Sequence, residues 1–416
     1  MSDAAAASGF PRLTYLRIKN YRALRDVKLR DLTPLTVFIG PNGSGKSTIL
    51  DALAFLAEAV SGNLQQAWEK RNRFAGMRTR GSEEAIEFEV GINSELGAIG
   101  YHLIIDGEDN RINAIHEQFL SGQEILFKSS YKSERGYTET FIPSMDETHE
   151  HRIYYNNEPA WRSTGEHRFE GWKDSILALL TGLATPFNEQ LKEFRQIITS
   201  YRYIHLTDDH LKGYSDAGPR EKLSANGDNL PNVLYYLHTK HPEALARISE
   251  QLRRWVPGLA EVVMESTSDE RLLLRFKDEP FEKPLPAQYM SDGTMRLAAL
   301  LTLLYEPNAT GLLGIEEPEN ELHPRLLPRL AEELSKATET RQLLVATHSP
   351  FLLDALEPEQ VWILDRGTDG YTQATRTADI PQVKELVEDG SPLGYLWTSN
   401  FFRIGDPLAP RTSPAQ

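Results

Sequence analysis

The sequence contains no cysteine among its 416 residues. Disulfides, thiolate zinc sites and cysteine nucleophiles are therefore excluded. The start of the chain lacks the basic residues and apolar segment of a signal peptide, and the longest apolar run, around residues 297–305, is far too short to span a bilayer. We therefore expect a soluble, cytoplasmic protein with no membrane partner.

Positive charge is also scarce. The chain has 45 Lys and Arg against 60 Asp and Glu, a formal net charge of −15. This balance disfavours a protein that coats nucleic acid over its whole surface, although it allows a local basic patch. The hydrophobic share of 40% is that of a globular protein. At roughly 150 residues per domain, the length predicts two to three domains, or one large domain with insertions.

The first and last thirds of the chain alternate strands with helices. Residues 13–20 and 35–40 predict strands, and helical spacing follows the second of them. In the last third we expect strands at 312–317, 342–348 and 361–365 and helices at 295–305 and 325–337. Such alternation predicts one mostly parallel sheet shared by the two thirds.

The middle of the chain has a different pattern. Residues 82–142 alternate apolar and polar residues between Gly, Asn and Asp turns, which predicts strands. Helical spacing follows over 171–200 and 230–255, and a strand pair is expected at 260–266 and 271–276. The chain has no internal repeat and no heptad run long enough for a coiled-coil arm.

A complete phosphate loop follows the strand at 35–40. The residues GPNGSGKS at Gly40–Ser47 fit the pattern G-x-x-x-x-G-K-[ST]. Glycines let successive backbone N–H groups turn toward phosphates, and the following helix offers its positive end. We expect Lys46 to contact the β- and γ-phosphates and to be a catalytic residue. We expect the Ser47 hydroxyl to bind Mg²⁺. The predicted nucleotide contacts are Gly40, Asn42, Gly43, Ser44, Gly45, Lys46, Ser47 and Thr48. Because no N-K-x-D sequence for reading guanine occurs, ATP is favoured over GTP.

Two carboxylates end a later hydrophobic strand, in the sequence LLGIEEPENELHP. Nucleotide chemistry lies at this end of the strands in an open α/β sheet. We assign Glu316 to Mg²⁺ and Glu317 to the base that deprotonates the attacking water. Glu316 is one methylene longer than the aspartate usual at its position, so the division of the two roles stays open.

Four ordered motifs together resemble the head of ABC-type ATPases, in the branch that contains RecF, SMC proteins and OLD nucleases. They are the phosphate loop, MSDGTMRLAALL at 290–301, the acidic sequence above and LLVATHSP at 343–350; LRIKNYRAL at 16–24 also fits. The resemblance implies an α/β P-loop NTPase fold: an ABC-ATPase-like head with a mixed sheet, an inserted antiparallel β lobe and a helical subdomain. We expect the P-loop core at 12–81 and 257–403, the insertion at 82–256 and a disordered tail at 404–416.

The same resemblance implies roles for single residues. Ser291 and Gly293 stand in the signature loop, which caps the γ-phosphate of ATP bound to the other subunit. Two protomers would then form an ATP-dependent homodimer with two ATP molecules sandwiched head to tail. His348 matches the switch histidine that senses the γ-phosphate, and residues 318–323 match the loop that crosses the dimer interface. Arg22 aligns with a nucleotide-binding arginine, with a plain surface arginine as the alternative; the glutamine-bearing Q-loop has no assigned position.

Spacing and absences narrow the function. Ser291 lies 245 positions after Lys46, farther than expected for a transporter ATPase subunit. Only 68 residues follow His348, without a D-x-D cluster, so an OLD-type nuclease of about 100 residues does not fit. A nuclease or other effector would be a separate subunit.

Three weaker clusters leave alternatives open. The basic run Lys70, Arg71, Arg73, Arg78 and Arg80 could face DNA phosphates or the nucleotide, or form a solvated loop. Two groups could ligate metal or lie in polar loops: His149 to His151, and His205, Asp208, Asp209 and His210. The aromatic segment 394–402 could pack on its own core or dock a partner.

The sequence thus predicts an ATP-hydrolysing switch that dimerises around ATP. By family analogy it would serve phage defence or DNA repair together with a partner effector and DNA. The alternative is an ATP-binding scaffold with little turnover, which the Glu316 variation favours. An ABC transporter subunit is the less favoured third reading.

Overall fold

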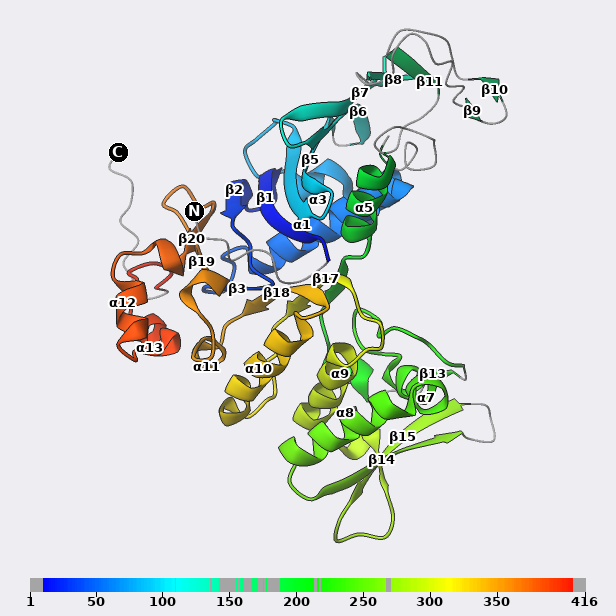
Figure 1. Ribbon diagram of the computed structural model, residues 1–416, viewed down its shortest axis with the longest axis vertical. Helices are drawn as coiled ribbons and strands as arrows, with labels where there is room; N and C mark the ends of the chain where they lie inside the picture. Colours follow the sequence, from blue (N-terminus) through cyan, green and yellow to red (C-terminus); the bar gives the residue numbers. More distant parts are fainter. Residues whose placement is uncertain are drawn as a thin grey trace.

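A parallel sheet lies between two lobes in the elongated molecule (Figure 1). The computed structural model describes residues 10–108, 110–134, 137–141, 154–155, 158–159, 166–170, 175, 177, 188–212, 215–216, 218–266 and 271–406. One lobe is built on an antiparallel sheet, and the other consists of helices with a small sheet.

The central sheet has six strands, of which five run parallel. Their order is β12 (Arg202–Ile204), β17 (Gly311–Glu316), β18 (Arg341–Thr347), β3 (Leu35–Ile39), β19 (Val361–Arg366) and the antiparallel edge strand β20 (Thr372–Arg376). Every residue of β3 and β18 is buried, as expected of strands covered on both faces. Because β3, β17, β18 and β19 all end at one edge, the segments that follow them meet there.

The second sheet has eight antiparallel strands. Their order is β11 (Glu166–Glu170), β8 (Tyr137–Phe141), β7 (Glu124–Lys132), β6 (Arg111–Ser121), β5 (Gly97–Glu108), β4 (Ile86–Ser94), β1 (Arg12–Tyr21) and β2 (Leu24–Arg30). The expectation that the first and last thirds share one sheet holds for β3 but is wrong for the strand at 13–20. That strand is β1, which alternates buried and half-exposed residues and pairs with β2 and β4, the pattern of an antiparallel strand with one wet face.

Helix α1 (Lys46–Glu58) lies between these two sheets. Its apolar residues join a core that reaches from β1 and β4 to Leu344 and Trp362 of the central sheet. Phe55 packs on Tyr21 and Phe88 with ring centroids 6.2 and 5.7 Å apart. The chain continues through η1 (Ala59–Asn63), α2 (Leu64–Lys70) and α3 (Arg73–Met77), and α5 (Asn188–Thr199) packs beside α1.

The other lobe covers the opposite face of the central sheet. It contains α6 (Asp208–Leu211), α7 (Leu230–Lys240), α8 (Pro242–Trp255), α9 (Asp292–Leu304) and α10 (Leu327–Ala337), with the small sheet of β13 (Ser215–Asp216), β14 (Leu259–Ser266), β15 (Arg271–Asp278) and β16 (Leu285–Pro286). Residues 294–304 of α9 are all buried, so this helix is the centre of the second core.

The remaining elements are short. They are β9 (Tyr154–Tyr155), β10 (Glu158–Pro159), η2 (Ala287–Tyr289), η3 (Pro324–Leu326), α11 (Pro350–Leu353), η4 (Pro358–Gln360), η5 (Thr377–Asp379), α12 (Val383–Glu388) and α13 (Leu393–Thr398). Within the aromatic segment 394–402, Leu396 and Phe402 are buried and Tyr395 is 64% exposed. Residues 407–416 of the expected tail, and most of 171–187 in the expected helical region, lie outside the described residues.

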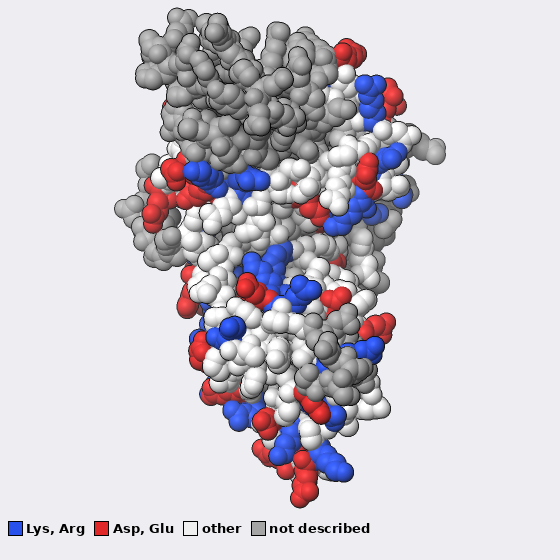
Figure 2. Space-filling model, turned by 90° about the vertical axis from the view of Figure 1, so that its right-hand side faces the viewer, with Lys and Arg blue, Asp and Glu red and all other residues white. Residues whose placement is uncertain are grey.

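The surface carries charge of both signs. On the face drawn in Figure 2, the described Lys and Arg side chains are interspersed with Asp and Glu. Among the described helices, none combines the length and the apolar character that a membrane span requires.

Candidate functional site

The phosphate loop joins β3 to α1 at the carboxyl edge of the central sheet. Gly43 and Gly45 have positive φ angles of 74° and 109°, a conformation that glycine adopts without strain. Gly45 also faces Thr372, and a Cβ there would collide with the Thr372 hydroxyl. Both observations explain why these two positions of the loop are glycine.

Lys46 is the first residue of α1 and is buried. Its Nζ donates to the carbonyl oxygens of Gly40 at 2.8 Å and Pro41 at 3.1 Å. Burial lowers the pKa of Lys46 to about 8, although the carboxylates of Glu317, Glu319 and Glu316 oppose the shift. The ammonium is therefore mostly charged at pH 7. It lies against the backbone at the start of the phosphate loop.

Glu316 ends β17 and faces the phosphate loop. One of its oxygens accepts a hydrogen bond from the Ser47 hydroxyl, 269 positions away in sequence. The other accepts from the Tyr203 hydroxyl and lies 3.0 Å from His205 Nδ1. Burial and Glu316 raise the pKa of Tyr203, so this hydroxyl keeps its proton and donates. A serine hydroxyl beside a carboxylate forms the hard oxygen donor set that Mg²⁺ prefers, so these residues fit that ion.

Glu317 turns away from Glu316, with a φ of 43°, the left-handed region that is uncommon for a non-glycine residue. Its Oε1 lies 3.3 Å from His348 Nε2, and its Oε2 accepts a hydrogen bond from Asn320 Nδ2 at 2.7 Å. Burial, with a smaller effect from Lys46, lowers the pKa of His348, so the imidazole is neutral at pH 7. The two adjacent carboxylates thus have different partners.

A third carboxylate, Glu319, holds the end of β18. Its Oε1 accepts hydrogen bonds from the Thr347 hydroxyl at 2.6 Å, the His348 backbone N–H at 2.7 Å and the Ser349 backbone N–H at 3.2 Å. These bonds fix the backbone at the histidine. Sequence reasoning did not single out Glu319, although it is the third acidic residue of the same segment.

The signature segment begins α9. Ser291 Oγ accepts a hydrogen bond from the Thr294 backbone N–H at 3.2 Å and so caps the helix. Gly293 lies so close to the Glu321 carbonyl that a Cβ would collide with it. Among the described residues, neither Ser291 nor Gly293 has a hydrogen bond to the phosphate loop of its own chain.

Arg296 connects α9 to the acidic strand end. Its side chain, 3% exposed, donates to the Glu317 carbonyl at 3.3 Å and to the Leu206 carbonyl at 3.2 Å. The signature helix and the backbone of Glu317 are therefore mechanically linked within one chain.

Arg22 lies beside α1, in the other lobe. It has a φ of 50°, and its guanidinium pairs with Asp51 at 2.9 Å and donates to the Gly76 carbonyl at 3.2 Å. Asp51 follows Ser47 by one helical turn. The side chain of Arg22 is 38% exposed, so it is neither a buried structural arginine nor a fully solvated one.

The β19–β20 hairpin forms hydrogen bonds with the phosphate loop. The sequence did not predict this contact. Arg366 Nε donates to the Gly43 carbonyl at 2.6 Å, and the Thr372 hydroxyl donates to the Ser44 carbonyl at 2.8 Å. Arg366 ends a strand adjacent to β3, so the sheet order would have placed it here. Arg366 is an exposed residue beside the loop.

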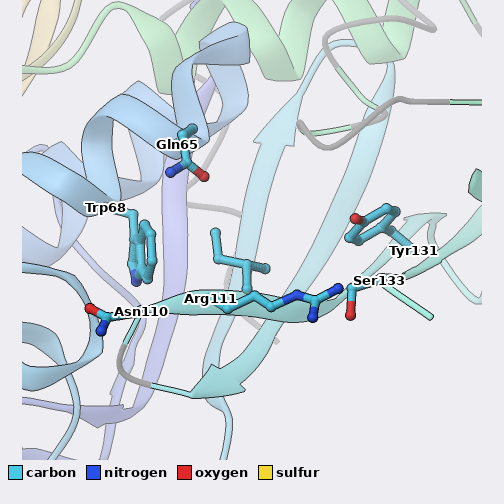
Figure 3. A pocket seen from close by; sticks show the side chains of 7 residues that line it. Gln65, Trp68, Asn110, Arg111, Tyr131 and Ser133 are labelled. Carbon is cyan, nitrogen blue, oxygen red and sulfur yellow. The ribbon is translucent and has the colours of Figure 1, made fainter. Parts of the chain in front are cut away.

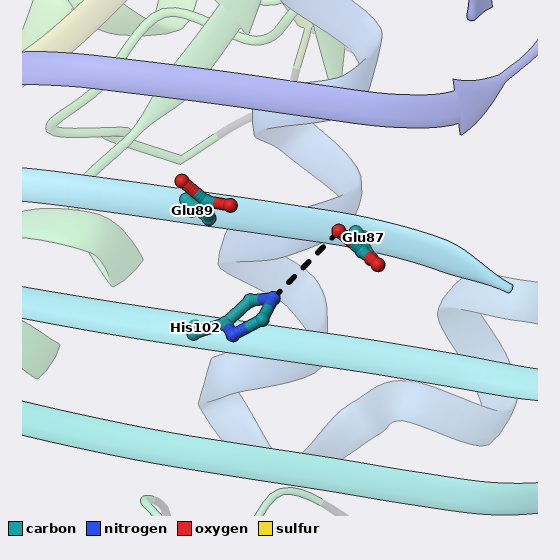
Figure 4. Close-up of side chains that lie close together, drawn as sticks. All are labelled: Glu87, Glu89 and His102. Atoms are coloured by element: carbon teal, nitrogen blue, oxygen red, sulfur yellow. Dashed lines mark ion pairs between the residues drawn. The ribbon is translucent and has the colours of Figure 1, made fainter. Parts of the chain in front are cut away.

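Two histidines of the weaker metal candidates lie among the described residues, and they have different partners. His205 faces Glu316, whereas His210 Nδ1 lies 2.7 Å from the Thr207 hydroxyl. Residues 149–151 lie outside the described residues. A different cluster, Glu87, Glu89 and His102, lies on the antiparallel sheet (Figure 4). Its carboxylates already pair with Lys19 at 3.1 Å and Arg17 at 2.6 Å, so it is part of a ladder of ion pairs across the strands.

This fold and this loop, with carboxylates and a histidine at the adjacent strand ends, define an ABC-type P-loop ATPase of the RecF/SMC/OLD branch. Residues 35–354 match the family described as "AAA domain, putative AbiEii toxin, Type IV TA system", and the chain belongs to this family. The family implies nucleotide binding. The expected family resemblance, fold class and ATPase class are thereby confirmed.

Several known proteins are similar. The "Retron Ec83 probable ATPase" of Escherichia coli is 21% identical over 421 residues, which cover 88% of this chain and 74% of that protein. A "DNA replication and repair protein RecF" of Corynebacterium jeikeium is 32% identical over 114 residues, 27% of this chain and 24% of that protein. An SMC head solved with the C-winged helix domain of ScpA shares the fold, with a TM-score of 0.52 and 14% identity over 87% of this chain and 97% of that one.

Proposed function

We propose that this chain is an ATP-hydrolysing switch whose nucleotide sites are completed between two copies. The observation that carries the proposal is the meeting of Ser47, Glu316, Glu317 and His348, from three different strand ends, at one edge of the central sheet. Transfer of a phosphoryl group to water needs a phosphate loop, a pair of oxygen donors for the metal ion and a separate base.

Ser47 and Glu316 would hold Mg²⁺. When bound, this ion neutralises charge that develops on the phosphate oxygens. Tyr203 and His205 fix the second oxygen of Glu316, so the carboxylate is oriented before nucleotide binds. This support compensates for the extra methylene of a glutamate at a position where aspartate is usual.

Glu317 would accept a proton from the attacking water. Asn320 and His348 hold its two oxygens, which orients the carboxylate. The neutral imidazole of His348 has a single N–H, which would serve either Glu317 or the γ-phosphate. Lys46 would exchange the carbonyls of Gly40 and Pro41 for the β- and γ-phosphates.

The place of the signature helix supports the proposed head-to-tail dimer. Ser291 and Gly293 stand at the start of α9, in the lobe opposite α1 (Figure 1), without hydrogen bonds to the phosphate loop of the described chain. Backbone N–H groups at a helix start bind phosphate well, and a second copy would bring those of α9 to the nucleotide. ATP bound between two copies would then shift the monomer–dimer equilibrium.

Complementation between inactive variants tests this arrangement. Lys46→Ala removes the phosphate-loop lysine, and Ser291→Arg blocks the cap, so each variant alone should be inactive. A mixture should regain a measurable part of wild-type hydrolysis, because one site of the mixed dimer then has an intact Lys46 and an intact Ser291. A mixture as inactive as its components would contradict the shared site.

The process served by the switch is proposed from the relatives. Proteins named as a retron ATPase, a DNA replication and repair protein and an OLD nuclease match this chain. We place it in a DNA-related process, phage defence or repair, with a separate effector subunit. The second candidate is a scaffold that binds ATP with little turnover, and the single observation in its favour is glutamate in place of aspartate at position 316.

A further inference from the structure

The antiparallel lobe contains a cavity of about 270 Å³ (Figure 3). Gln65 and Trp68 of α2, Asn110 and Arg111 at the start of β6, and Tyr131 and Ser133 at the end of β7 line it. None of these residues contributes to the nucleotide site described above.

None of the described residues that line the cavity carries a carboxylate, and several of them are hydrogen-bond donors. Trp68 is 2% exposed, and its indole N–H has no hydrogen-bond partner in the described part of the chain. A buried donor without a partner is costly, which favours a ligand acceptor or water there. The exposed Arg111 guanidinium likewise makes no ion pair with a described residue. Tyr131 and Ser133 add hydroxyl groups.

One member of the basic run at 70–80 lies against residues that line the cavity. Three others have carboxylate partners: Lys70 and Arg71 share Glu58 at 2.8 and 2.6 Å, and Arg78 pairs with Asp106 at 3.5 Å. Arg73 differs from them.

The guanidinium of Arg73 lies 5.5 Å from the centre of the Trp68 ring and donates to Asn110 Oδ1 at 2.7 Å. Both partners line the cavity and neither is charged. Arg73 and Arg111 therefore place two positive charges beside a pocket that contains aromatic rings and hydrogen-bond donors.

We propose that this cavity binds one nucleotide unit of a single-stranded nucleic acid. Arginine guanidinium groups match phosphate geometry, and amides, hydroxyls and an indole N–H suit the acceptor-rich edge of a base. The volume lies just below the range of about 300–1,000 Å³ typical of small-molecule pockets, which admits one base and excludes a duplex. The proposal rests on the DNA-related role proposed above, but it does not depend on ATP hydrolysis.

The test uses the full-length protein and a fluorescently labelled oligothymidylate of about twelve nucleotides, without ATP. Arg111→Ala should weaken binding at least about fivefold and lower the slope of log affinity against log salt by about one, since one phosphate contact is lost. The matched control is Arg253→Ala, which removes an exposed arginine from α8 in the other lobe and should leave binding unchanged. Trp68→Phe, checked for unchanged melting, should weaken binding without changing the salt slope.

The outcomes separate the proposals. Thymidine monophosphate could compete with the oligonucleotide for the wild-type protein and not for Arg111→Ala. This result would show that the cavity accepts a free nucleotide, and it would support nucleotide recognition. Absent oligonucleotide and mononucleotide binding, or equal loss in Arg111→Ala and Arg253→Ala, overturns the proposal. ATP hydrolysis without oligonucleotide should be the same in Arg111→Ala and wild type. If the wild-type protein hydrolysed no ATP but bound the oligonucleotide in a way that depends on Arg111, the proposed ATPase mechanism would be rejected. The proposed nucleotide-binding cavity would still stand.

Discussion

Glu319 accepts a hydrogen bond from the backbone N–H of His348 at 2.7 Å, so a carboxylate after β17 fixes the histidine that follows β18. His348 in turn lies 3.3 Å from Glu317, two residues before Glu319. The base, the histidine and their support thus form a closed loop of contacts across two adjacent strands. Such support holds the reacting groups in position before the substrate arrives.

We predict that Glu319→Ala lowers kcat for ATP hydrolysis about tenfold and leaves ATP affinity unchanged, because a displaced His348 misplaces the reacting groups. Steady-state kinetics beside a nucleotide-binding measurement checks this. Glu332→Ala, which removes an exposed carboxylate from α10, is the charge-matched control. If Glu319→Ala and Glu332→Ala had the same kcat, Glu319 would not be a positioning residue.

Glu317→Gln and Glu316→Gln should behave differently. Glu317→Gln should lower hydrolysis by at least about 100-fold and retain ATP binding, because only the base is lost. Glu316→Gln should raise the Mg²⁺ concentration needed for half-maximal activity, since its contact with Ser47 marks the metal position. Magnesium titrations of both variants check this, and the reverse pattern would exchange the two roles.

ATP affinity should fall as the pH rises from 7 to 9. The pKa of Lys46 is about 8 in the free protein because of burial, so the ammonium loses its proton over this range. Phosphates favour the charged form, and binding at pH 8 should therefore take up protons. Calorimetry in buffers of different ionisation enthalpy measures this uptake. Lys46→Ala should bind ATP far more weakly and without pH dependence, and an unchanged affinity would contradict the role of the phosphate loop.

Arg366 should contribute to nucleotide binding through its place beside the loop. We expect Arg366→Ala to weaken ATP binding about five- to tenfold, because it removes a cation and the hydrogen bond to the Gly43 carbonyl. Arg329→Ala, an exposed arginine on α10, is the comparison. Fluorescent nucleotide titrations that give the same affinity for both variants would leave Arg366 with a purely structural role.

Local patterns predicted the parts of the site that lie within one segment. The phosphate loop, the acidic pair and the histidine each follow a recognisable strand, and carboxyl ends of parallel strands meet at one edge. The contacts of Tyr203 and Arg366 depend on β12 lying beside β17 and β19 beside β3, and strand order has no local signal. For the same reason the sequence assigned the strand at 13–20 to the wrong sheet.

The central claim is that hydrolysis needs two copies of the chain. Its most direct test is the steady-state rate of ATP hydrolysis per subunit as protein concentration rises, for wild type beside Glu317→Gln. We predict a wild-type rate per subunit that increases with concentration to a plateau and a variant rate near zero throughout. A wild-type rate per subunit that is constant down to the lowest concentrations at which the protein is monomeric would contradict the shared active site.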